Sequence, residues 1–141
     1  MYRKILVALE NSNADEAVMP HVAALAKLHG AELLLVHVAD GFAARNFDQL
    51  KLVESDEMKA DRAYLEKAAE KLRAQGATVH AKLELGDPAM QIVKIASAEN
   101  CDLIAMASHG HRLIGDILHG STINEVRHKT AVPLLLVRAA R

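Results

Sequence analysis

The sequence is poor in aromatic residues and has no tryptophan: Phe, Trp and Tyr make up only 3% of its 141 residues, whereas 51% are hydrophobic overall. Its core must therefore consist of Leu, Ile, Val, Ala and Met. The single cysteine, Cys101, excludes an internal disulfide. No apolar run approaches the roughly 18 residues of a membrane span, and the N-terminal run is too short for a signal peptide. We therefore expect a cytoplasmic protein without a membrane partner.

The chain also lacks an excess of charge of either sign. Its 17 basic and 18 acidic residues give a formal net charge of −1, so no global field attracts nucleic acid, and we expect no nucleic-acid partner. The length fits one domain with a substantial core. We therefore expect a single domain over residues 1–141.

Short apolar runs alternate with helical patterns along the chain. The runs that are nearly continuous in apolar residues are 4–9, 32–38, 102–107 and 132–138. Such runs are typical of parallel strands that are covered on both faces. A fifth run, residues 78–85, alternates between apolar and polar residues and so indicates an edge strand.

The intervening helices have recognisable ends. The first is expected from near Asn13 to Gly30 and the second over residues 55–75. The third has Asp87 as its N-cap and Pro88 at its first position. The fourth is expected over residues 120–129. Strands and helices in this order predict a doubly wound α/β fold, in which ligands bind beyond the carboxyl ends of the strands.

One of these carboxyl ends is followed by the segment "SHGHRLIGDILHGST", residues 108–122. Gly120 lies at a predicted helix start, where free N–H groups and the helix dipole favour an anion, and the hydroxyls of Ser121 and Thr122 can donate to phosphate. By itself, however, Gly-Ser-Thr at a helix start is most often plain N-capping.

Known phosphate-binding motifs do not fit this segment. Gly115 and Gly120 have Walker A spacing, but Ser121 stands where the motif requires lysine. No GxGxxG motif follows the first strand, and "ENSNAD" after that strand has no glycine for a flavodoxin-like loop. A response-regulator receiver is excluded as well, because Glu10 has no adjacent acidic residue and the third strand ends without a phosphoacceptor aspartate.

The chain resembles universal stress proteins over its whole length. The segments that carry this resemblance are KILVALENS (4–12), LLLVHV (33–38), GDPAMQIV (86–93), LIAMASHG (103–110), GSTINEVRH (120–128) and VPLLLV (132–137). The family has a doubly wound, five-stranded parallel sheet in the order 3-2-1-4-5. Its members are usually dimers that pair through strand five, and one branch binds ATP through the motif G-x2-G-x9-G-(S/T).

The resemblance implies an adenine-nucleotide site, with ATP as the first candidate and Mg²⁺ or Mn²⁺ held by phosphate oxygens and water. Its expected residues are Ala8, Leu9, Glu10, Val38, Met106, Ala107, Ser108, His109, Gly110, His111, Arg112, Gly120, Ser121 and Thr122. Residues near the strand ends would border the nucleoside, and those from Gly110 to Thr122 would hold the phosphates.

The motif is altered at two positions. Its first glycine falls on Ala107, and the acidic residue after the first strand, usually Asp, is Glu10. If residue 107 needs a positive φ, alanine costs on the order of 1 kcal/mol; if it only needs to be small, the methyl group is absorbed. In a weakened site, restoring glycine at 107 would tighten nucleotide binding.

Three histidines, His109, His111 and His119, share the same loop, but only Asp116 accompanies them, so we expect no dedicated transition-metal site formed by these side chains. No nucleophile with a base and an orienting residue is present, so we expect nucleotide sensing without significant turnover, not an enzyme.

We expect a homodimer that pairs through the apolar run from Val132 to Val137, because an open apolar edge strand is otherwise prone to aggregate. The client protein is not encoded in any motif. Two alternatives remain open at this stage: a nucleotide-independent dimeric interaction module, and a weak hydrolase or phosphotransferase.

Overall fold

The computed structural model describes residues 1–39, 56–109 and 120–139. Within these ranges the strands are β1 (Lys4–Ala8), β2 (Glu32–Ala39), β3 (Val79–Leu85), β4 (Leu103–Ser108) and β5 (Leu134–Arg138). The helices are α1 (Asp15–His29), α4 (Asp56–Ala74), α5 (Pro88–Ala98) and α6 (Gly120–Lys129). The helix and strand order predicted from the sequence is thus confirmed.

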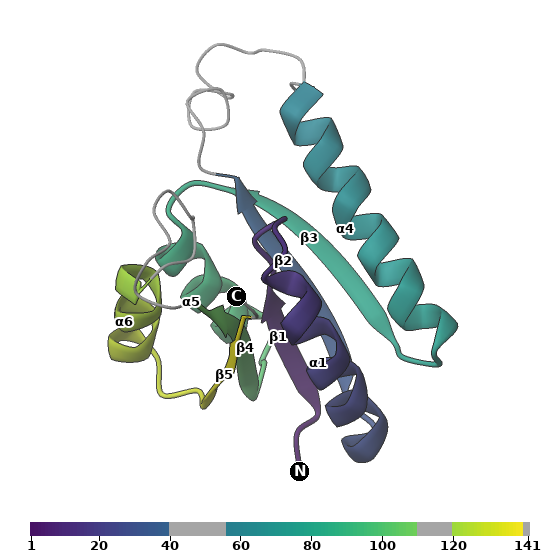
Figure 1. Ribbon diagram of the computed structural model, residues 1–141. Helices are drawn as coiled ribbons and strands as arrows, with labels where there is room; N and C mark the ends of the chain where they lie inside the picture. Colours follow the sequence, from purple (N-terminus) through teal and green to yellow (C-terminus); the bar gives the residue numbers. More distant parts are fainter. Residues whose placement is uncertain (40–55, 110–119, 140–141) are drawn as a thin grey trace.

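The strands form one parallel sheet in the order β3-β2-β1-β4-β5. Helices α1 and α4 cover one face, and α5 and α6 cover the other (Figure 1). The fold is therefore the doubly wound α/β sandwich that the sequence predicts, and the alternating run 78–85 does supply an edge strand.

Successive side chains of the central strands point to opposite faces of the sheet, so the core consists of two layers. In β1, Ile5 and Val7 pack with α1 and α4, whereas Leu6 and Ala8 pack with α5 and α6. All four are essentially inaccessible to solvent, as a strand covered on both faces requires.

Two element boundaries differ from the sequence prediction. Helix α1 begins at Asp15, two residues after the expected Asn13, because the carbonyls of Ser12 and Asn13 accept three-residue turn bonds from Asp15 and Glu16. Strand β5 begins at Leu134, not at residue 132.

Pro133 stands just outside β5 because it has no N–H to donate to the sheet. Its carbonyl nevertheless accepts the N–H of Ile104 at 3.0 Å, so the proline leads the chain into the pairing between β4 and β5. At the start of α5, Asp87 is the N-cap, as expected, and accepts the N–H of Met90 at 2.9 Å.

The topology fixes where a ligand can lie. From β1 the chain adds β2 and then β3 towards one edge of the sheet. It later adds β4 and β5 towards the other edge, so the strand order reverses at β1. The carboxyl ends of β1 and β4 are adjacent there, in register from Ile5↔Leu103 to Ala8↔Met106. In sheets of this type such a switch point is where ligands bind.

Candidate functional site

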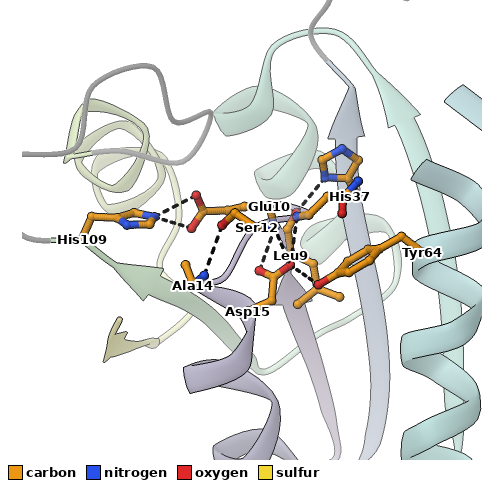
Figure 2. A network of polar contacts seen from close by, with 9 residues as sticks. Leu9, Glu10, Ser12, Ala14, Asp15, His37, Tyr64 and His109 are labelled. Atoms are coloured by element: carbon orange, nitrogen blue, oxygen red, sulfur yellow. Dashed lines mark hydrogen bonds and ion pairs between the residues drawn. The ribbon is translucent and has the colours of Figure 1, made fainter. Parts of the chain in front are cut away.

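The residues that follow β1 and β4 meet at this switch point. Nε2 of His109 lies 2.6 Å from Oε2 and 2.8 Å from Oε1 of Glu10 (Figure 2). Both side chains are almost fully buried, with 5% of His109 and 2% of Glu10 exposed. Two residues from the predicted list are therefore brought together by the pairing of β1 with β4.

This pair is a charge-assisted interaction shielded from water. An ionised carboxylate can only accept, so the proton of the shared hydrogen bond is on Nε2 of His109. A carboxylate offers about four lone-pair positions, so it can accept more than one hydrogen bond at a time.

The loop between β1 and α1 is organised by the carboxylate of Asp15, the first residue of α1. Its Oδ1 accepts the N–H of Glu10 at 2.9 Å and its Oδ2 accepts the N–H of Asn11 at 2.9 Å. Asp15 is buried, and its position in the first turn also suits the positive end of the helix dipole. The backbone that carries Glu10 is thus anchored to α1.

Helix α4 contributes a second carboxylate and a tyrosine to this loop. Tyr64 donates its hydroxyl to Oδ2 of Asp15 at 2.5 Å, and Asp61 accepts the side-chain amide of Asn11 at 2.7 Å. Burial, with the hydrogen bond to Asp15, raises the pKa of Tyr64 well above its ordinary value, so the phenol stays protonated and donates.

His37, two residues before the end of β2, completes the network. Its Nδ1 donates to the carbonyl of Leu9 at 2.9 Å, and its Nε2 lies 3.6 Å from Oδ2 of Asp61. His37 is buried, and its two ring nitrogens face the Leu9 carbonyl and the Asp61 carboxylate.

The sequence analysis missed Asp61 and Tyr64. One signal could have located Asp61: it lies at helical spacing between Met58 and Leu65, within the apolar stripe of α4, and is buried with them. A carboxylate within such a stripe requires a partner, and here the partners are Asn11 and His37.

Five of the expected site residues lie within the core, on opposite faces of the sheet. Ala8, Val38 and Met106 pack towards α5 and α6, and Leu9 and Ala107 pack towards α1 and α4. Each is at most 3% exposed. They form the base of the switch point, and Ser108 closes β4 by accepting the N–H of Ala139 at 2.9 Å.

Ala107 is an ordinary strand residue, paired with Val137 of β5. The non-glycine residues with positive φ in the described part of the chain are Asn11 and Asn100. The explanation that Ala107 strains a left-handed position is therefore wrong: parallel pairing on an extended strand requires negative φ, which alanine adopts freely.

The phosphate end of the expected site is described in part. Helix α6 begins at Gly120, as predicted, and Thr122 in its first turn is buried. Gly110, His111 and Arg112, as well as His119, lie outside the described residues, as does the side chain of Ser121.

Over the ranges that the structure covers, no three His, Cys, Asp or Glu side chains are grouped to hold a metal ion. In the same ranges, no helix is long and apolar enough to cross a membrane.

Comparison with known proteins places this geometry in a family. The model of the universal stress protein family matches residues 1–138. Universal stress protein MJ0577 of Methanocaldococcus jannaschii is 32% identical, over 98% of this chain and 96% of its own length. The solved structure of MJ0577 superposes with a TM-score of 0.83, at 30% identity and with 100% and 99% of the two chains covered.

Two further solved structures share the fold at lower identity. A universal stress protein from Archaeoglobus fulgidus in complex with dAMP has a TM-score of 0.71 at 24% identity, covering 96% of this chain and 98% of its own. A universal stress protein in complex with cAMP has a TM-score of 0.72 at 18% identity, covering 99% and 98%. With the family model and the 32% identical relative in agreement, the chain belongs to the universal stress protein family.

Proposed function

We propose that this protein binds an adenine nucleotide, ATP in the first instance, at the carboxyl end of its sheet, and acts as a dimeric regulator of the stress response in the cytoplasm. The observation that carries the proposal is the buried carboxylate of Glu10, held beside His109 where the strand order reverses. A buried, oriented acceptor at this point of an α/β sheet suits the hydroxyl groups of a ribose.

The two ends of the expected ligand correspond to two different parts of the fold. Glu10 and the core residues around it lie at the end of β1 and would contact the nucleoside. The first turn of α6, from Gly120 to Thr122, would receive the phosphates, because its free N–H groups and the helix dipole favour anions. Mg²⁺ or Mn²⁺ would accompany a triphosphate, bound chiefly by phosphate oxygens and water.

The fold itself accommodates such ligands. Universal stress proteins with this architecture have been solved in complex with dAMP and with cAMP. These two complexes support adenine-nucleotide binding by proteins of this fold. The choice of ATP rests on Gly110, Gly120 and Ser121, which follow the motif of the ATP-binding branch.

We propose sensing without significant turnover. The sequence has no P-loop lysine and no nucleophile with a base and an orienting residue. Glu10, the acidic residue nearest the expected nucleoside, is already held by His109. Nucleotide binding would then alter the surface presented to the second subunit or to a client protein.

The proposed dimer pairs through β5. This strand lies at the edge of the sheet, and Leu136 within it is 45% exposed. An open edge with an exposed leucine is a liability that pairing with a second copy removes.

Native mass spectrometry of the purified protein tests both parts. We expect a dimer that carries adenine nucleotide, and release of the nucleotide on dilution if its affinity is low. A dimer without nucleotide, even with millimolar MgATP added, would favour the alternative of a nucleotide-independent interaction module. A monomer at high concentration would contradict the β5 pairing.

A further inference from the structure

Three consecutive residues centred on Glu10 are each held by a side chain from another element (Figure 2). The carbonyl of Leu9 accepts from His37 of β2, and the N–H groups of Glu10 and Asn11 donate to Asp15 of α1. Because each of these residues is held, the Glu10 side chain starts from a fixed backbone position. This reduces the entropic cost of ordering the loop around a ligand.

Asp61 acts on this loop through Asn11. Asn11 has a φ of 61°, a left-handed conformation that costs energy for any residue with a side chain. Its amide Nδ2 donates to Oδ1 of Asp61 at 2.7 Å, while Oδ2 of the same carboxylate faces His37 at 3.6 Å. Asp61 thereby links Asn11 to β2, the strand whose His37 holds Leu9.

Tyr64 acts through Asp15. Its hydroxyl donates to Oδ2, the oxygen that also accepts the N–H of Asn11, and the second oxygen accepts the N–H of Glu10. Tyr64 thus fixes the rotation of the carboxylate that anchors the loop. Asp61 and Tyr64 are three residues apart on α4, so one helix face delivers both contacts.

We propose that Asp61 and Tyr64 are positioning residues: from α4 they fix the backbone of Glu10 and Asn11 and so set where the Glu10 carboxylate meets a bound nucleotide. The part concerning affinity rests on the proposed function, and the part concerning the loop does not. Helix α4 is separated from the loop by about 50 residues of sequence, so displacement of this helix by a partner would reach the nucleotide site through these two contacts.

The test uses two variants, each with a matched control. Asp61→Ala is compared with Glu70→Ala, which removes an exposed carboxylate from the same helix. Tyr64→Phe is compared with Tyr2→Phe, which removes the hydroxyl of the tyrosine packed against His29 at the far end of β1. Tyr64→Phe loses one hydroxyl only and remains informative if Asp61→Ala folds poorly.

Amide hydrogen exchange measured by NMR reports on the loop without any ligand. Loss of a hydrogen bond to a charged group raises the equilibrium constant for local opening about tenfold or more. We therefore expect at least tenfold faster exchange of the Glu10 and Asn11 amides in both variants. The amides of Leu6 and Val7 in β1 should exchange as in wild type, and both controls should match wild type throughout.

ATP affinity, measured in the wild-type and Glu10→Gln backgrounds, reports on the connection to the site. We expect Asp61→Ala and Tyr64→Phe to weaken binding about five- to tenfold in the wild-type background and less than twofold once Glu10 is replaced, because coupled residues are not additive. A purely structural role would lower thermal stability equally in both backgrounds without this coupling.

The outcomes separate the two proposals. Unchanged exchange at Glu10 and Asn11, or equal loss of affinity in both backgrounds, would overturn the positioning role. Faster exchange in a protein that binds no ATP even as wild type would support the positioning of the loop and reject the proposed nucleotide function.

Discussion

Glu10 and His109 are 99 residues apart in the sequence, yet Nε2 of the histidine lies within 2.8 Å of both carboxylate oxygens of the glutamate. The contact joins the end of β1 to the end of β4 at the switch point of the sheet. It therefore connects the two strands at the place where we propose that the nucleoside binds.

Removing the imidazole should destabilise the fold. His109→Ala leaves the Glu10 carboxylate buried without the imidazole that donates to it, and breaking a buried pair in this way costs about 3 kcal/mol in the free energy of unfolding. Urea denaturation at pH 7 measures this, with His80→Ala on the exposed face of β3 as the control. A loss no larger than that of the control would show that the pair contributes little.

Glycine at position 107 should not repair the site. Ala107 is fully buried in β4 and already has ordinary strand geometry, so Ala107→Gly loses packing and gains backbone entropy in the unfolded chain, at a cost of about 1 kcal/mol. ATP affinity should change by less than about twofold. Ala105→Gly, a buried position on the same face of β4, is the control for stability. Tenfold tighter binding in Ala107→Gly alone would restore the view that this methyl group obstructs the ligand.

The two left-handed asparagines should respond differently to glycine. Asn100 has a φ of 56° and is exposed after α5, so Asn100→Gly should change the free energy of unfolding by less than about 0.5 kcal/mol, since relief of φ and greater unfolded-state entropy oppose each other. Asn11→Gly relieves a similar φ but removes the donor to Asp61, so we expect a loss of about 1 kcal/mol or more. Equal effects in thermal or urea unfolding would mean that the Asp61 contact adds no stability.

An ion pair between Lys4 and Glu99 at the other end of the sheet predicts a pH dependence. Nζ of Lys4 lies 3.0 Å from Oε1 of Glu99; the hydrogen bond between them raises the pKa of Lys4 above its ordinary 10.5 and lowers that of Glu99 below its ordinary 4.5. The pair therefore stabilises the fold at neutral pH. Its contribution is lost at acidic pH, as the pH falls below 4.5 and through the lowered pKa of Glu99. It is also lost at alkaline pH, as the pH rises above 10.5 and through the raised pKa of Lys4.

Glu99→Gln isolates this contribution. The variant should be slightly less stable than wild type at pH 7, and the difference should shrink as the pH falls from 4.5 to 3, as measured by urea unfolding at each pH. A difference that persists unchanged at pH 3 would point to a cause other than charge.

The strand and helix pattern could be predicted from sequence because it depends on local periodicity. Continuous apolar runs such as 4–9 and 32–38 mark strands that are buried on both faces, and Asp87 with Pro88 marks the start of α5. The boundaries that shifted, at Asn13 and Pro133, depend on turn hydrogen bonds and on pairing with a neighbouring strand, neither of which is local.

The candidate site was predictable only in outline. Glu10 and His109 were both expected at the site, but their mutual contact depends on the pairing of β1 with β4. Asp61 and Tyr64 lie on a helix whose exposed face reads as ordinary surface charge, and the loop residues that they contact, Asn11 and Asp15, are about 50 residues away. The sequence places Ala107 at the end of the fourth strand, but its backbone conformation follows from its pairing with Val137 of β5, which the sequence does not reveal.

Isothermal titration of MgATP into the wild-type protein and into Glu10→Gln tests the central claim most directly. We predict saturable binding of one nucleotide per chain by wild type and at least tenfold weaker binding by Glu10→Gln, because a hydrogen bond to a charged group is worth about 1.5 kcal/mol or more. Absence of binding to wild type at millimolar MgATP, or equal affinity of the two proteins, would contradict a nucleotide site built around Glu10.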